Sequence, residues 1–132
     1  MNLNQVTLPA VDLDISISFY VGMGFRQIVS SPEYARFECP EGESTFSLEL
    51  ASRPSSGVGA IIYFECQDLD ATVMKLRANG YVFDTLPADE KWLWREAHLM
   101  DPAGTRICLF WAGQMRKFPP WRVSSGIEAQ CR

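Results

Sequence analysis

The sequence predicts an α+β domain in which two tandem βαβββ modules form a curved mixed sheet around a cleft. The main observation is a repeat, because Asp12-Leu13-Asp14 recurs 56 residues later as Asp68-Leu69-Asp70. An alternating apolar pattern precedes both copies at the same offset: Val6, Leu8 and Ala10 in the first, and Ile62, Phe64 and Cys66 in the second. Agreement of strand pattern and helix start at one offset indicates one supersecondary unit present twice.

Each module is expected to run strand, helix and then three strands. Asp12 and Asp68 are predicted N-caps, apolar residues at helical spacing follow them, and Gly24 and Gly80 end the two helices. The three later strands are predicted at Phe25–Ser30, Tyr34–Cys39 and Thr45–Ala51 in the first module, and at Tyr81–Leu86, Trp92–Met100 and Thr105–Trp111 in the second. In both last strands the apolar alternates are expected to face the helix: Phe46, Leu48, Leu50, Ile107, Leu109 and Trp111.

The last two strands of the second module are predicted to form a hairpin with an unusual outer face. Asp101-Pro102-Ala103-Gly104 has the composition of a tight turn. Alternation then places one set of side chains on the face away from the helix: Trp94, Glu96, His98, Arg106, Cys108 and Phe110. A solvated surface seldom carries such large aromatic residues, so this face is interpreted as the wall of a cavity.

One domain is expected to cover residues 1–113, with modules at 1–51 and 58–112, a linker at 52–57 and an irregular tail at 114–132. The tail contains Phe118-Pro119-Pro120-Trp121, which cannot form a regular strand. Its last residues are expected to be mobile, and Trp121 is a candidate for folding back onto the body of the domain.

Composition narrows the classes of partner and the compartment. A net charge of −4 and a pI near 4.9 disfavour nucleic-acid binding. No apolar run approaches the roughly 20 residues of a membrane span, and the first residues do not read as a leader peptide. The four cysteines form no Cys-x-x-Cys pair, which argues against a zinc knuckle or a disulfide framework and favours free thiols in the cytoplasm.

These motifs together resemble the vicinal oxygen chelate superfamily, which includes glyoxalase I, extradiol dioxygenases, and fosfomycin and bleomycin resistance proteins. The resemblance covers roughly residues 3 to 112 and implies the glyoxalase/bleomycin resistance fold and a homodimer. It also implies metal-ligand positions at Gln5, Glu49, Ile61 and Cys108. Because isoleucine cannot bind an ion, a metal-dependent glyoxalase-like lyase or isomerase, with a divalent ion on Gln5, Glu49 and Cys108, is the alternative function.

The preferred function follows from a second, local resemblance. Trp94-Arg95-Glu96, followed by the turn at Asp101 and an aromatic last strand, resembles the hairpin of bleomycin resistance proteins, which bind a cationic aromatic drug without metal or turnover. We therefore expect metal-independent binding of a small or medium-sized, partly aromatic molecule in the inter-module cleft, and assign no catalytic residue. The expected ligand-binding residues are Glu49, Tyr63, Trp94, Glu96, His98, Arg106 and Phe110.

Several of these residues have two interpretations. Glu49 is either an anchor for a cationic ligand or an ion-pair partner of Arg106 or Arg36. His98 is either a general base, which would need Glu96 or Glu49 beside it, or a hydrogen-bonded structural histidine. Free cysteines such as Cys108 usually behave as small buried hydrophobes. A third function, a pure interaction module, would have its cleft filled by its own side chains.

Overall fold

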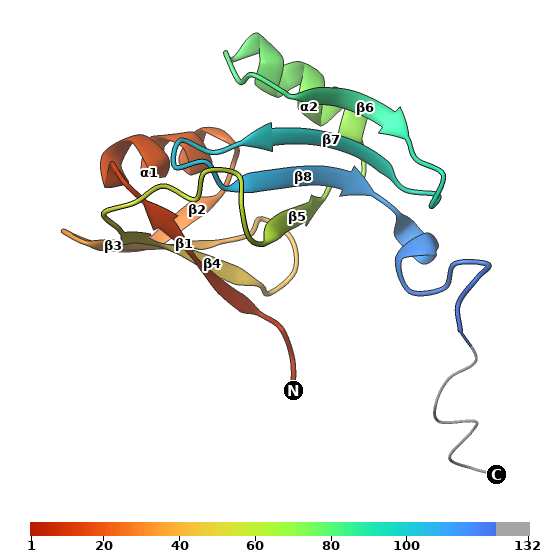
Figure 1. Ribbon diagram of the computed structural model, residues 1–132, viewed down its shortest axis with the longest axis horizontal. Helices are drawn as coiled ribbons and strands as arrows, with labels where there is room; N and C mark the ends of the chain where they lie inside the picture. The colour runs from red at the N-terminus through yellow and green to blue at the C-terminus, as the bar shows by residue number, and fades with distance from the viewer. Residues whose placement is uncertain (124–132) are drawn as a thin grey trace.

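Two consecutive βαβββ modules make up the structure, a computed structural model that describes residues 1–123 (Figure 1). The first contains β1 (Gln5–Ala10), α1 (Leu13–Gly22), β2 (Arg26–Ser31), β3 (Tyr34–Glu38) and β4 (Thr45–Leu50). The second contains β5 (Ile61–Glu65), α2 (Leu69–Ala78), β6 (Thr85–Asp89), β7 (Arg95–Met100) and β8 (Arg106–Trp111), followed by a 3-10 turn, η1 (Gly113–Arg116). The prediction of a mobile chain end and that of a free thiol at Cys131 fall outside the described residues.

Each module forms its own four-stranded mixed sheet, and the two sheets have the same strand plan. The orders are β1-β4-β3-β2 and β5-β8-β7-β6. The first strand runs parallel to the last, with Gln5 opposite Thr45 in one module and Ile61 opposite Arg106 in the other. The remaining neighbours are antiparallel. The predicted α+β fold with two tandem modules is confirmed, and the sheets do not close into a barrel.

The predicted helix ends are confirmed. The Asp12 side chain accepts a hydrogen bond from the Ile15 backbone N–H at 3.1 Å, and Asp68 accepts one from Ala71 at 3.2 Å. Each bond satisfies an N–H group that has no partner within its helix. After each helix the chain needs a residue at positive φ, and Gly24 (108°) and Gly80 (95°) supply it.

The two modules share one apolar core on the helix-covered faces of their sheets. The rings of Phe25 and Phe64, from different modules, have centroids 4.6 Å apart. The Tyr20 hydroxyl on α1 donates a hydrogen bond to Asp101 Oδ2, in the β7–β8 turn, at 2.6 Å. Buried apolar side chains enter this core from both sheets: Leu8, Phe46, Leu48, Leu99, Ile107 and Leu109. The opposite faces, called here the first open face (β1, β4, β3) and the second open face (β5, β8, β7), carry the polar and aromatic alternates.

The strand predicted at Tyr81–Leu86 is displaced, because β6 begins only at Thr85. Tyr81 turns towards the first module instead, and its hydroxyl donates to the Phe19 carbonyl at 2.5 Å. Phe83 also packs against the shared core. Two aromatic residues that were predicted to lie in a strand therefore pack between the modules, and this contact was not predicted.

The strand predicted from Trp92 also starts later, at Arg95. Leu93 has a φ of 69°, which interrupts extended backbone and makes a turn in which its N–H donates to the Glu90 carbonyl at 2.9 Å. Two apolar alternates expected against the helices, Leu50 and Trp111, end their strands and are partly exposed. The rest of the predicted alternation is confirmed.

The segment after β8 leaves the second sheet. Its start is fixed by Glu65, whose Oε2 accepts hydrogen bonds from the backbone N–H groups of Ala112 and Gly113. Trp121 is exposed, so the expectation that it folds back onto the body is wrong. Within residues 1–123, neither α-helix has the length and hydropathy needed to cross a bilayer.

Candidate functional site

Strand alternation gathers most of the predicted site residues on the second open face. Cys108 on β8 lies opposite Tyr63 on β5 and opposite His98 on β7, and Phe110 lies opposite Glu96. Residues directly opposite one another in adjacent strands point to the same side of a sheet. One face therefore carries six of the seven expected ligand-binding residues: Tyr63, Trp94, Glu96, His98, Arg106 and Phe110.

Three aromatic side chains, called here the aromatic shelf, are in mutual contact. The rings of Trp94 and Phe110 stack with centroids 4.7 Å apart and planes 21° from parallel. Tyr63 meets both edge-on, at 5.8 Å from Trp94 and 5.6 Å from Phe110. Phe110 is buried and Trp94 half-buried, whereas Tyr63 is 45% exposed. The shelf is a preformed apolar surface with an accessible edge.

Beside the shelf lies a group of three polar residues, called here the polar cluster: Glu96, His98 and Cys108. Glu96 is only 4% exposed, and its Oε2 accepts a hydrogen bond from Trp92 Nε1 at 2.5 Å. Its Oε1 lies 3.0 Å from His98 Nε2. The Cys108 sulfur lies 3.9 Å from the same nitrogen. One ligand atom from each residue falls within 4.8 Å of the others, so this group could hold a metal ion.

The Cys108 thiol is not arranged as a nucleophile. Burial, followed by the charge of Glu96, raises the pKa of Cys108 to about 12, so the thiol keeps its proton at neutral pH. A catalytic relay needs one imidazole nitrogen for the nucleophile and the other for the carboxylate. Here His98 Nε2 serves both neighbours, so the geometry does not support a Cys-His-Glu relay.

Arg106 and Glu49 are not brought together. Arg106 Nη2 donates to the Gly59 carbonyl at 3.0 Å, and its Nε is buried and has no partner among residues 1–123. Glu49 is exposed on the first open face, opposite Tyr34, and takes part in no ion pair within the described part of the chain. Arg36, its other candidate partner, donates from Nε to the Tyr34 hydroxyl at 3.0 Å.

The alternative metal set of Gln5, Glu49 and Cys108 does not converge either. Gln5 lies opposite Thr45, four residues from Glu49 along β4, which corresponds to about 13 Å of strand. Gln5 Nε2 instead donates to Ser47 at 2.7 Å. Cys108 belongs to the other sheet. An ion at the positions that the family resemblance implies would therefore lack a common set of donors in this chain.

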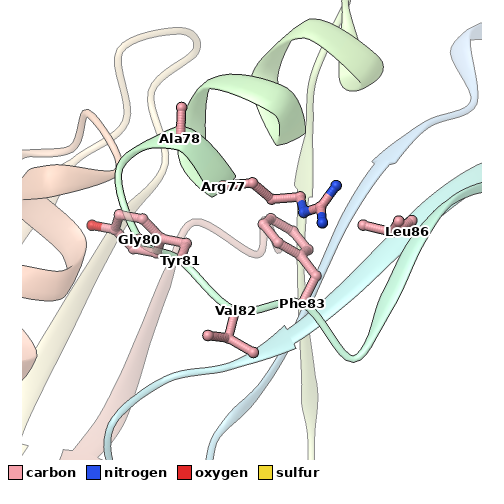
Figure 2. Close-up of a pocket in the computed structure, with 7 residues that line it drawn as sticks. All are labelled: Arg77, Ala78, Gly80, Tyr81, Val82, Phe83 and Leu86. Carbon is pink, nitrogen blue, oxygen red and sulfur yellow. The ribbon is translucent and has the colours of Figure 1, made fainter.

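A hollow of about 570 Å³ lies away from these residues, at the turn that follows α2 (Figure 2). It is lined by Arg77, Ala78, Gly80, Tyr81, Val82, Phe83 and Leu86. None of these residues belongs to the aromatic shelf or the polar cluster. The hollow therefore lies where the chain runs from α2 to the displaced start of β6, and no residue of the candidate site lines it.

A family model described as "Glyoxalase/Bleomycin resistance protein/Dioxygenase superfamily" matches residues 2–109. The chain belongs to this superfamily. No curated protein is similar enough in sequence to be matched with the chain. The predicted resemblance to the vicinal oxygen chelate superfamily is thus confirmed.

Solved structures of other members share the fold. A glyoxalase/bleomycin resistance protein/dioxygenase from Nocardioides is 22% identical with a TM-score of 0.77, over 94% of this chain and 90% of that one. A bleomycin-binding protein complexed with bleomycin is 18% identical with a TM-score of 0.70, over 84% and 98%. Lactoylglutathione lyase from Agrobacterium tumefaciens is 18% identical with a TM-score of 0.68, over 83% and 92%. Identities this low establish the fold and leave the activity open.

Two features of this superfamily member were not predicted. Trp92 donates a hydrogen bond to Glu96, and between them Leu93 has a positive φ that the sequence pattern does not indicate. The first open face carries a polar network in which Ser47 contacts the Tyr34 hydroxyl and the Gln5 amide. Its bonds with Ser47, and then with Arg36, lower the pKa of Tyr34. The alternation of Thr45, Ser47 and Glu49 was the available signal for this face.

Proposed function

We propose that this chain binds a small or medium-sized, partly aromatic molecule on the second open face, and that binding requires no metal. The supporting observation is the aromatic shelf of Tyr63, Trp94 and Phe110 next to a buried carboxylate. Aromatic stacking adds about 0.5–1.5 kcal/mol per pair beyond the burial of apolar area. A planar ligand on the shelf would gain both contributions.

The polar neighbours of the shelf set the chemistry of the ligand. Glu96 accepts one hydrogen bond at each oxygen, and a carboxylate has about four acceptor sites, so acceptor capacity remains for a donor on the ligand. A cationic nitrogen suits this end, because a buried carboxylate is stabilised by an opposite charge. Arg106, two residues from Cys108 on β8, is partly exposed and would provide a positive charge for an oxygen at the other end of the ligand. The bleomycin complex of a structural neighbour is consistent with a ligand of this type.

We also propose that the chain acts as a homodimer in the cytoplasm. The shelf is open on one side, so a second copy that presents another sheet face would shield the bound ligand from water. Cys39, Cys66 and Cys108 are free, which suits a reducing compartment. Glu49, on the first open face, would contribute to binding only if such an assembly brought the two kinds of face together.

Thermal shift and calorimetric titration with metal-free bleomycin and acridine, both in EDTA, test the proposed function. We expect at least one probe to raise Tm, because a ligand that binds only the folded state stabilises it. Trp94→Ala should weaken binding of that probe at least tenfold, through loss of stacking and buried area. The matched control is Trp111→Ala, which removes a tryptophan from the opposite face of the same sheet and should change affinity less than twofold. Equal losses in both variants, or no shift with either probe, would contradict the proposal.

The alternative, a metal-dependent glyoxalase-like lyase or isomerase, has less support. The similar structure that favours this alternative is the lactoylglutathione lyase, and that similarity establishes the fold alone. Gln5 lies opposite Thr45, four residues from Glu49 along β4, which counts against the common donor set that this alternative requires. Ligand binding on the shelf therefore remains the preferred function.

A further inference from the structure

The donors of the polar cluster lie close together, and only Cys108 among them is at a position that the family resemblance implies for a metal ligand. Glu96 and His98 lie two residues apart on β7, and Cys108 lies directly opposite His98 on β8. Their three ligand atoms lie within 4.8 Å of one another. We propose that Glu96, His98 and Cys108 bind a zinc-type divalent ion at a site that adjoins the aromatic shelf and shares Glu96 with the proposed ligand site. This inference goes beyond the proposed function and does not rest on it.

Two of the three donor separations lie close to those around a tetrahedral ion. Zinc lies about 2.0–2.1 Å from an imidazole nitrogen, about 2.0–2.2 Å from a carboxylate oxygen and about 2.3 Å from a thiolate sulfur. A tetrahedral angle then sets the nitrogen-oxygen separation at about 3.4 Å and the nitrogen-sulfur separation at about 3.6 Å. The observed separations are 3.0 Å for Glu96 Oε1 to His98 Nε2 and 3.9 Å for His98 Nε2 to Cys108 Sγ. Each differs from the requirement by a few tenths of an ångström.

The chemistry of the donors selects the kind of ion. A thiolate is a soft ligand and suits zinc, whereas magnesium and calcium prefer oxygen donors only. Binding transfers the Cys108 thiol proton to the solvent and forms a metal–sulfur bond, without oxidation or reduction. The thiolate and the Glu96 carboxylate then offset the two charges of the ion. Three protein ligands leave a fourth position for water or for an oxygen of another molecule.

The surroundings hold the cluster in this arrangement. Trp92 Nε1 binds Glu96 Oε2 and leaves Oε1 directed at His98, which is the kind of outer contact that orients metal ligands. Glu96 and Cys108 are buried, while the His98 side chain is about one-third exposed, so an ion has a route from solvent. The corresponding positions of the first module are Tyr34, Arg36 and Ser47, where a guanidinium excludes a cation. The donor set is thus specific to the second module.

Titration of the reduced, metal-free protein tests the site. Zinc affinity is measured by competition with a chromophoric chelator, and cobalt absorption reports whether a thiolate is bound. We expect one ion per chain and a sulfur-to-cobalt charge-transfer band. Cys108→Ser should remove this band, and Cys108→Ser and His98→Gln should each weaken zinc binding at least tenfold. Cys66→Ser, which alters a half-buried thiol outside the cluster, is the matched control and should bind as the wild type does.

The outcomes also separate this inference from the proposed function. Trp94→Ala should keep zinc affinity while it loses binding of the organic probe. Circular dichroism checks that each variant folds, and His98→Gln, at a side chain that is one-third exposed, gives a readout if the buried Cys108 variant does not fold. The inference is overturned if the wild type binds no zinc, if Cys108→Ser and His98→Gln bind as tightly as the wild type, or if the loss follows Cys66→Ser.

Discussion

Ser47 lies at the centre of the first open face, where it is opposite Arg36 on β3 and Thr7 on β1. Cys108 has the same place on the second open face, opposite His98 on β7 and Tyr63 on β5. The strand register is therefore repeated between modules. The side chains differ, because hydroxyl, amide and guanidinium groups bond to one another on the first face, while a carboxylate, an imidazole and a thiol meet on the second.

This contrast shows that the two modules share a backbone plan and differ in the side chains on their open faces. The shared backbone plan places equivalent positions together but assigns them no chemistry, which depends on the side chains at those positions. At the first-face positions equivalent to the polar cluster, Arg36 provides the charge, so a cation is disfavoured there. On the second face the buried Glu96 provides it, beside the aromatic shelf. Substitutions that remove one difference between the modules test what each difference contributes.

The largest expected effect on the free energy of unfolding comes from Asp101, in the turn before β8. Asp101 is buried and accepts hydrogen bonds from the Tyr20 hydroxyl and from the backbone N–H groups of Ala103 and Thr105. Asp101→Ala leaves these three donors without their partner, and we expect a loss of about 2–4 kcal/mol in the free energy of unfolding. Urea denaturation measures it.

The equivalent turn of the first module supplies the control for this prediction. Glu41 is exposed there, so Glu41→Ala should change the free energy of unfolding by less than about 0.5 kcal/mol. Tyr20→Phe, which removes only one donor, should fall between the two variants. Similar values for Asp101→Ala and Glu41→Ala would show that the link between the modules through this turn contributes little.

A smaller effect is expected when Cys108 is replaced by the residue of the first module, as Cys108→Ser. Burial raises the pKa of Cys108 to about 12 in the folded state, while the unfolded thiol titrates near its ordinary value of 9.0. Above pH 9 the unfolded chain therefore binds fewer protons than the folded chain, and stability falls as pH rises. Serine does not titrate in this range. The stability difference between wild type and Cys108→Ser should shift by about 2 kcal/mol against the wild type between pH 8 and pH 10.5.

Urea denaturation in a reducing agent at both pH values measures this shift. Ile107→Val, a core truncation on the same strand, is the control, and its difference from the wild type should not depend on pH. A pH-independent difference for Cys108→Ser as well would mean that the thiol titrates in the folded protein much as it does in the unfolded chain.

The repeat, the helix caps and the two faces of each last strand were predictable because they depend on local patterns. The N-cap bonds of Asp12 and Asp68 and the stacking of Trp94 on Phe110 follow from residue type and alternation. The start of β6 was not predictable, because Tyr81 satisfies the strand pattern but contacts the other module. A single sequence does not specify which aromatic residues serve such a long-range contact.

The site was predictable as a face but not as an arrangement of atoms. Six expected residues lie on the second open face because period-two alternation holds along β5, β7 and β8 and extends to Trp94, just before β7. The position of Glu49 relative to Gln5 depends on the register of the parallel pair β1 and β4, for which the repeat gave no constraint. The proximity of Glu96, His98 and Cys108 depends on side-chain rotamers. The placement of Trp92 beside Glu96 involves the turn at Leu93.

The smallest expected effect concerns the residue after each helix, Phe25 in the first module and Tyr81 in the second. The Tyr81 hydroxyl donates to the Phe19 carbonyl, and Gly22 leaves the space that it occupies. Tyr81→Phe makes the two modules alike and removes this one hydrogen bond, for an expected loss of about 0.5–1.5 kcal/mol in the free energy of unfolding. Tyr63→Phe makes the same chemical change on the exposed shelf and should have almost no effect. Urea denaturation measures both losses. If the two variants lose equal stability, the Tyr81 hydroxyl does not stabilise the contact between the modules, and only the packing of the Tyr81 ring does.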